Sequence, residues 1–492
     1  MSAEVAVGLG QFRGAVMRGL AWKAGTQFVA QISRLIVAVV VARLLSPHDY
    51  GVAGMVLVFS SLLLVFSDLS LGAALVQREK ISQDDKSTVF WTSVGAGLMF
   101  TLVGIASAGF VADFFNEPAV KPLFMALSCG FFITSLATTH SALLNRDLNF
   151  RSLELRQMGG IVAGAVVGIT LAAEGGGAWA IIGQQLATMT VSTICLWWFS
   201  GWRPSLSFSL PSLRSLGGFS ANVFGTRLLF YVNRNLDNLL VGKYVGPAAL
   251  GAYSLAYQVM LVPFNQIASP IQEVLYPAFS RMQEEPSRMA RVWVDVNRIV
   301  GAISLPALVG LIITAPDFVV TILGAKWTPA IGVIQILCWV GLLQSLQRLN
   351  SSILQARDRT RDLLVYSVII LVGSVIAFVG GLPWGIVGVA AAYAAMSTIV
   401  EPYYTWLTAR SLGVSVFALP RALAGVALAT TGMALVLVPL RLGLVHAGVP
   451  AAARLVIVIL CGTLVYIPLA LWRAPELRTA AASLRRRRAA RA

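Results

Sequence analysis

The chain has 492 residues, of which 57% are apolar and only 12% are charged, and its mean hydropathy is +0.78. A soluble domain carries about 25% charged residues, so this composition excludes a water-soluble globular protein. The formal net charge is nevertheless +16, which raises the question of where 37 Lys and Arg residues lie in so apolar a chain.

Apolar stretches predict an all-α polytopic membrane protein with fourteen transmembrane helices. Each stretch is close to the ~20 residues that cross a bilayer core, and helices satisfy the backbone polar groups that lipid cannot. The predicted spans are 19–43, 51–76, 88–111, 120–144, 158–173, 178–200, 219–242, 250–279, 299–316, 329–354, 363–382, 384–409, 418–440 and 450–472.

The basic residues test this count independently. With the amino terminus in the cytoplasm, 27 Lys and Arg residues fall on the inner side, six on the outer side and four inside spans. Such a bias is typical of cytoplasmic loops, so both termini are predicted to be cytoplasmic. The run Arg485 to Arg488 then fixes orientation and attracts anionic lipid headgroups, and we expect no nucleic-acid partner.

An internal repeat relates two halves of the chain at a shift of about 200 residues. Arg34 corresponds to Arg234, and Pro47 and Gly51 correspond to Pro247 and Gly251. Spans 1–6 are therefore predicted to repeat as spans 7–12 with the same orientation, and two such six-helix bundles can enclose a central cavity, as in transporters.

These observations predict six segments. They are a cytoplasmic N-terminal segment (1–18), a first six-helix bundle (19–200), a cytoplasmic linker (201–218), a second six-helix bundle (219–409), two additional helices (410–472) and a basic cytoplasmic tail (473–492).

Ionisable residues inside the spans are the candidate functional groups, because each is costly in lipid and usually faces water or a partner. The basic members are Arg34, Arg227, Arg234 and Arg348, and Gln31 shares a helical face with Arg34. Guanidinium groups match phosphate geometry, so we predict a cationic cavity that binds a phosphate or pyrophosphate headgroup.

The acidic residues leave two alternatives open. Asp68 and Asp237 could pair with Arg34 and Arg234, which would make the charges structural, or Asp237 and Glu273 could bind a coupling proton or sodium ion. Three prolines at intervals of seven, Pro263, Pro270 and Pro277, each remove a helical hydrogen bond. They predict either a hinge or a static bend in the eighth span.

No motif indicates a cofactor, a metal site or an enzyme. The four cysteines lie in apolar runs without CxxC spacing, and the three histidines are scattered. Walker A, HExxH and GxSxG patterns are absent from the sequence. Gly160, Gly164 and Gly168 form a small-residue stripe that predicts close helix packing.

Five stretches resemble the bacterial polysaccharide and oligosaccharide flippases of the multidrug/oligosaccharidyl-lipid/polysaccharide exporter superfamily, above all the colanic-acid-type exporters. They are ARLLSPHDYGVAGM (42–55), FSDLSLGAALVQRE (66–79), STVFW (87–91), LNRDLNFR (144–151) and RNLDNLLVGKYVGPAALGAYSLAYQ (234–258).

The resemblance implies a flippase that moves undecaprenyl-diphosphate-linked oligosaccharide units across the bacterial inner membrane by alternating access, for O-antigen, capsule or exopolysaccharide synthesis. It implies that the four arginines face this substrate, that the protein acts as a monomer among membrane lipids, and that a polysaccharide polymerase and chain-length or export proteins are its candidate protein partners. A peptidoglycan lipid-precursor flippase, a cation-coupled multidrug antiporter and a membrane polymerase or ligase are the alternatives.

Overall fold

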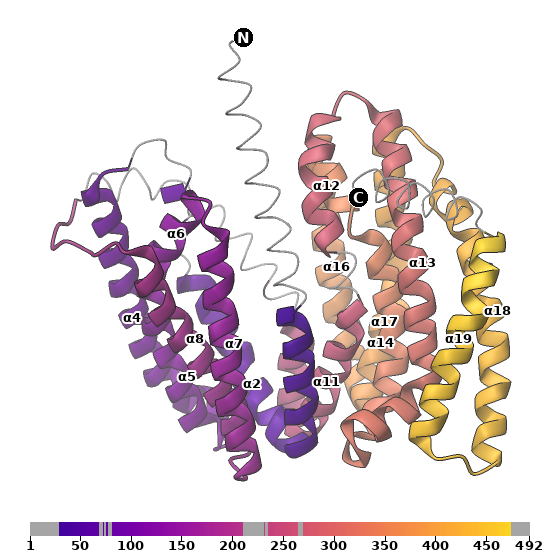
Figure 1. Ribbon diagram of the computed structural model, residues 1–492, viewed down its shortest axis with the longest axis horizontal. Helices are drawn as coiled ribbons and strands as arrows, with labels where there is room; N and C mark the ends of the chain where they lie inside the picture. The colour runs from indigo at the N-terminus through magenta and orange to yellow at the C-terminus, as the bar shows by residue number, and fades with distance from the viewer. Residues whose placement is uncertain are drawn as a thin grey trace, which may run out of the picture. The chain divides into compact units, whose positions relative to one another are not determined.

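The computed structural model describes residues 29–67, 72, 75–76, 81–209, 231, 235–263 and 269–473, and these residues form helices and loops without a strand. The chain divides after Gly251 into two compact units. Each unit is a bundle of elongated helices (Figure 1).

The described part of the first unit begins with helical residues 29–44. The helices that follow have their apolar faces packed mainly in sequential pairs, with α4 against α5 and α7 against α8. They are α2 (Pro47–Ser67), α4 (Gln83–Phe115), α5 (Val120–Ser135), α6 (Thr138–Arg146), α7 (Phe150–Ala173) and α8 (Trp179–Ser200).

The second unit contains most of α11 and all the elements that follow it. They are α11 (Pro247–Pro263), α12 (Ser269–Arg281), α13 (Pro286–Phe318), the short helices η2 (Val319–Leu323) and η3 (Ala325–Trp327), α14 (Ala330–Gln347), α15 (Asn350–Ala356), α16 (Thr360–Gly381), η4 (Leu382–Trp384), α17 (Gly385–Leu412), α18 (Ala418–His446) and α19 (Ala451–Arg473).

Corresponding helices occur in the same order in the two halves of the chain. Helices α4 and α13 are each 33 residues long and begin 203 positions apart. The turn after α6 and the turn after α15 also share one hydrogen-bond pattern. Leu148 donates to the Asn145 carbonyl as Asp358 donates to the Gln355 carbonyl, both at 3.1 Å, and Leu148 and Asp358 both have a positive φ.

Local sequence sets the start of α2. Ser46 caps the helix, since its Oγ accepts the Asp49 N–H at 3.1 Å and donates to Asp49 Oδ2 at 2.5 Å. Pro47 occupies the first helical position, where its missing N–H costs nothing. Helix α4 begins with an equivalent capping box between Ser82 and Asp85.

Among the described residues, eight helices are long and apolar enough to cross a membrane, or nine if the α5–α6 pair is one span bent by 42°. The stretch Thr360–Leu412 counts once in that number. At ~1.5 Å per residue its 53 residues would be about 80 Å long, far more than a bilayer core. Since α16 and α17 pack against each other, this stretch is a hairpin. The protein is a multi-pass membrane protein, and fourteen spans remains a prediction.

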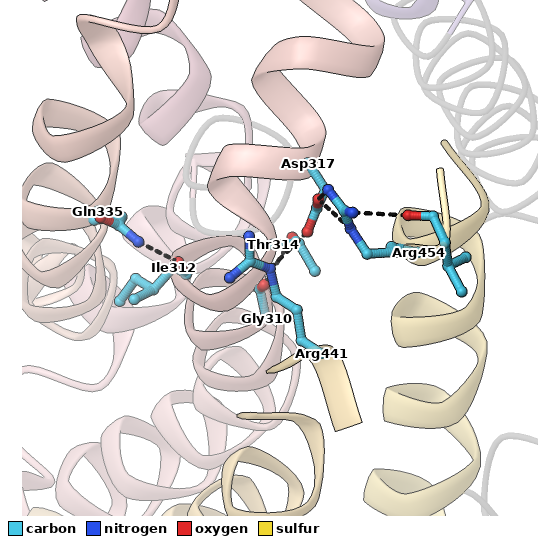
Figure 2. A network of polar contacts seen from close by, with 8 residues as sticks. Gly310, Ile312, Thr314, Asp317, Gln335, Arg441 and Arg454 are labelled. Atoms are coloured by element: carbon cyan, nitrogen blue, oxygen red, sulfur yellow. Dashed lines mark hydrogen bonds and ion pairs between the residues drawn. The ribbon is translucent and has the colours of Figure 1, made fainter. Parts of the chain in front are cut away.

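Helix α13 contains two prolines, and side chains from neighbouring helices compensate for both. A proline deprives the carbonyl four residues earlier of its helical donor. Tyr466 of α19 donates its hydroxyl to the Ala302 carbonyl at 2.6 Å, opposite Pro306. Gln335 of α14 donates to the Ile312 carbonyl at 3.0 Å, opposite Pro316 (Figure 2). Helix α13 is thereby bonded to both neighbours.

A buried carboxylate attaches the α18–α19 hairpin to α13. Asp317 is 1% exposed. Arg441 of α18 donates from Nε to Asp317 Oδ2 at 2.6 Å, and Arg454 of α19 donates from Nη2 to Oδ1 at 2.6 Å (Figure 2). Arg454 also bonds the Val449 carbonyl at 2.7 Å. Two arginines that the sequence placed on the outer side therefore contact one acid.

The glycine stripe of α7 packs closely against α8, as predicted. A Cβ at Gly160 would overlap Ser192 Oγ, and a Cβ at Gly164 would overlap Thr188 Oγ1. A Cβ at Gly168 would lie 2.9 Å from Gln184 Cβ. The lack of side chains at these three glycines therefore allows α7 and α8 to pack closely.

Candidate functional site

The second unit contains a cluster of buried polar side chains on α13, α14, α15, α16 and α17. Its centre is Glu401, which is 2% exposed and accepts a hydrogen bond from the Tyr366 hydroxyl at 3.2 Å. We call the group the Glu401 cluster. Its members are Trp293, Gln347, Asn350, Tyr366, Glu401, Tyr404 and Thr405.

Hydrogen bonds connect these helices through the cluster. Gln347 Nε2 donates to Thr405 Oγ1 at 2.8 Å and also bonds the Glu401 carbonyl. Asn350 donates to Gln347 and accepts the Trp293 indole N–H at 3.0 Å. Because a partly satisfied buried network is costly, these bonds hold α13, α14, α15 and α17 in register at this level.

Two aromatic rings lie next to the Glu401 side chain. Tyr366 and Tyr404 stack with their centroids 3.7 Å apart and their planes within 9°. Glu401 lies inside the predicted twelfth span (384–409) but was not among the acids selected from the sequence. The signal was present, because Glu401 is an ionisable residue inside an apolar run, where such residues are rare and functional.

Arg348 lies next to this cluster. It caps the C-terminus of α14, is partly buried and acts electrostatically on Tyr404, which also bonds Ser351. Gln272 of α12 donates to Ser351 and Ser352 at 3.3 and 3.2 Å. The predicted substrate arginine of this half is thus positioned where α12, α14, α15 and α17 meet.

In the first unit, Arg34 and Gln31 lie on the helix over residues 29–44. Arg34 Nη1 donates to Gln31 Oε1 at 3.3 Å, and Arg34 is exposed. Within the described residues this weak intrahelical bond is the one that the Arg34 guanidinium makes, which leaves most of its five donors for a ligand. Arg34 therefore remains a candidate ligand residue.

Some of the other candidate residues lie within the described part of the chain and some lie outside it. Arg227, Arg234 and Asp68 lie outside the described residues, and with them both predicted arginine–aspartate pairs. Asp237 is 4% exposed and accepts the Asn238 N–H at 2.8 Å. The backbone of Glu273 lies in α12.

The three prolines lie on two helices in the described part of the predicted eighth span. Pro263 is the last residue of α11, Pro270 is in the first turn of α12, and Pro277 is inside α12. Residues 264–268 between the two helices lie outside the described residues. A hinge there remains a prediction.

The described part of the chain lacks the ligand set of a metal site. Groups of three or more His, Cys, Asp and Glu side chains that could hold a metal ion do not occur there. The fold and the site define a polytopic membrane protein with buried polar groups between its helices, which is the arrangement of a transporter.

The profile of the family described as "Polysaccharide biosynthesis protein" matches residues 40–332. The chain is 29% identical over 343 residues to the lipopolysaccharide biosynthesis protein WzxC of Escherichia coli (strain K12), covering 69% of this chain and 70% of the relative. It is 26% identical over 406 residues to the teichuronic acid biosynthesis protein TuaB of Bacillus subtilis (strain 168), covering 81% and 83%. The chain belongs to this polysaccharide biosynthesis family, whose members are transporters and not enzymes.

Solved structures share the fold. The inward closed conformation of the lipid II flippase MurJ matches with a TM-score of 0.74 at 16% identity, covering 93% of this chain and 99% of that one. An inward-facing multidrug resistance MATE family transporter of the MOP superfamily matches with a TM-score of 0.62 at 15% identity, covering 78% and 94%. At these identities the likeness concerns the fold.

Proposed function

We propose that the protein is a flippase that moves undecaprenyl-diphosphate-linked oligosaccharide units across the bacterial inner membrane by alternating access, with both termini in the cytoplasm. The observation that carries the proposal is the combination of a polysaccharide-family sequence with cationic groups in the bundles. Arg34 is exposed and bonds Gln31 on its own helix, and Arg348 lies at the end of α14 beside Tyr404. Guanidinium groups bind phosphate through charge-assisted, bidentate hydrogen bonds.

The predicted repeat of two six-helix bundles supports the alternating-access part of the proposal. The matching helix order, the equal 33-residue helices and the shared turn after α6 and α15 are what a tandem repeat predicts. Transporters built from parallel repeats bind substrate at the repeat interface. In this arrangement Arg34 and its equivalent Arg234 are substrate-facing.

An apolar groove supports a lipid-linked substrate. A cavity of about 490 Å³ lies between α13, α18 and α19, and its lining includes Leu311, Phe318, Leu437 and Ile459. Such a volume suits a ligand, and its apolar lining suits a polyprenyl chain, each buried CH₂ of which contributes about 0.8 kcal/mol.

Complementation of a deletion strain tests the function. Wild-type protein should restore surface polysaccharide, and Arg34→Ala and Arg348→Ala should abolish it at normal membrane levels. Arg34→Lys should rescue only in part, since an ammonium lacks the bidentate fork. Arg288→Ala, in an exposed ion pair with Glu285, is the matched control and should export normally.

The identity of the lipid that accumulates separates the alternatives. We expect lipid-linked oligosaccharide to build up in the inner leaflet of the deletion strain. Accumulation of the peptidoglycan lipid precursor would favour that flippase activity instead, and unchanged lipids with increased drug sensitivity would favour a multidrug antiporter. Normal polysaccharide in both alanine variants would refute the role given to the arginines.

A further inference from the structure

A second cavity, which is lined by polar side chains, lies in the first unit, away from the residues considered above. It has a volume of about 340 Å³ and lies between the α5–α6 bend, α7 and α8. One arginine and several hydroxyl side chains line it: Thr134, Thr138, Ser141, Arg156, Thr188, Ser192 and Thr193. We call it the Arg156 pocket.

One nitrogen of the Arg156 guanidinium has no acceptor in the described part of the chain. Nε of Arg156 is buried and makes no hydrogen bond there. Glu154, two residues earlier on α7, is buried and acts on Arg156 through its charge, but residues two apart do not face each other on a helix. A buried charged donor without an acceptor is costly, so the pocket favours a ligand that brings one.

The hydroxyl side chains of the pocket offer hydrogen-bond acceptors, whereas Arg156 offers donors. Thr134 donates its proton to the Gly130 carbonyl at 2.9 Å, Thr138 to the Thr134 carbonyl at 3.4 Å, and Thr193 to the Ile133 carbonyl at 3.1 Å. A hydroxyl that has donated its proton retains lone pairs. The oxygens of these side chains therefore act as acceptors toward a ligand.

Spacing directs one group of hydroxyl side chains to the same side. Thr134, Thr138 and Ser141 follow at intervals of four and three, which places them on one helical face across the α5–α6 bend. A ligand in the pocket would meet donors from Arg156 and acceptors from this face. Its own groups must be an anion and several hydroxyls.

We propose that the Arg156 pocket binds a sugar that carries an anionic group, either a phosphate or a carboxylate. The inference rests on the proposed function, because it assigns this subsite to the sugar part of the substrate. The volume is at the lower end of the range for small-molecule pockets, which limits the occupant to one or two sugar residues.

Binding of soluble probes tests the pocket without any transport. Purified full-length protein in phosphatidylcholine nanodiscs is titrated with glucose 1-phosphate, glucuronate, glucose and inorganic phosphate, with ligand-detected NMR as the readout. At least one of the two sugar anions should bind at least about tenfold more tightly than glucose or inorganic phosphate. The preferred probe identifies the anion as phosphate or carboxylate.

Variants assign the binding to this pocket. Arg156→Gln should weaken the preferred probe by at least about tenfold, the loss expected for one charge-assisted contact, and Arg156→Lys should weaken it less. Thr138→Val and Ser141→Ala should weaken the sugar anion but leave inorganic phosphate unchanged. Arg151→Gln, an exposed arginine on the same helix, is the matched control and should bind as wild type.

Two results would overturn the proposal. One is unchanged binding in Arg156→Gln, and the other is equal binding of glucose and its anionic derivatives by wild-type protein. Size-exclusion chromatography shows whether Arg156→Gln folds. If it does not, unchanged probe selectivity in Thr138→Val and Ser141→Ala would overturn the proposal instead. The proposed function is tested separately. If the Arg34 and Arg348 alanine variants lose export, that function is supported even when the pocket fails these binding tests.

Discussion

Gly51 and Gly251 pack against each other through reciprocal contacts at the starts of α2 and α11. A Cβ built on Gly51 would overlap the Pro247 carbonyl oxygen, and a Cβ built on Gly251 would overlap the Pro47 carbonyl oxygen. Each Cβ would also lie 3.0 Å from the backbone nitrogen of the other glycine. Two residues that the predicted repeat relates to each other thus make reciprocal backbone contacts.

This contact predicts that neither glycine tolerates a methyl group. Gly51→Ala and Gly251→Ala should each lower the free energy of unfolding by about 1–3 kcal/mol, the usual effect of overpacking, measured by chemical denaturation in mixed micelles. The control is Gly95→Ala, because a Cβ there meets nothing within 4 Å. Wild-type stability in both variants would show that the two helix starts are not in contact.

The proline in the middle of α13 predicts a specific double-mutant result. Tyr466→Phe removes the donor to the Ala302 carbonyl and should cost about 1–3 kcal/mol, the penalty of an unsatisfied buried acceptor. Pro306→Ala supplies a backbone N–H for the same carbonyl. In the Pro306→Ala background the cost of Tyr466→Phe should therefore fall below about 0.5 kcal/mol. Equal costs in both backgrounds would contradict the assignment.

The Asp317 contact predicts a large loss of stability from a small change. Asp317→Asn leaves Arg441 and Arg454 without their shared carboxylate and should cost about 3 kcal/mol, as for other broken buried pairs. Glu285→Gln removes an ion pair whose side chains are more than half exposed, and should cost less than about 1 kcal/mol. Thermal unfolding in detergent gives the comparison. Similar losses in the two variants would argue against a buried Asp317 pair.

The glycine stripe predicts a difference between a position on the stripe and a glycine of α7 outside it. Gly164→Ala should destabilise the protein by about 1–3 kcal/mol, because the new Cβ overlaps Thr188 Oγ1 and lies 2.8 Å from the Gln184 carbonyl oxygen. Gly159→Ala places its Cβ 3.6 Å from Cys195 Sγ, an ordinary contact, and should be tolerated. Denaturation of the two variants side by side measures the difference, and identical curves would contradict close α7–α8 packing.

The class of protein could be read from the sequence, because lipid imposes long apolar helices whatever their partners are. The stretch 158–173 falls inside α7 and the stretch 418–440 inside α18, since hydropathy alone decides which residues enter a bilayer. The small-residue stripe of α7 was readable for a similar reason, because a spacing of four places glycines on one face. The family could be recognised from stretches such as 42–55, which lie at helix ends, where the local backbone restricts which residues can occur.

Partners could not be read, because a polar side chain in a span gives no indication of which helix it meets. The sequence places Asp317 and Arg454 at the outer ends of predicted spans, and only the packing of α19 against α13 brings them to 2.6 Å. Glu401 became prominent through its burial next to the stacked rings of Tyr366 and Tyr404. Arg156 became prominent through a pocket formed by α5, α6, α7 and α8. Sequence therefore determined the apolar helices through the solvent that surrounds them. Tertiary structure decided which polar groups are satisfied by the protein and which remain for a ligand, because that depends on contacts between residues far apart in the chain.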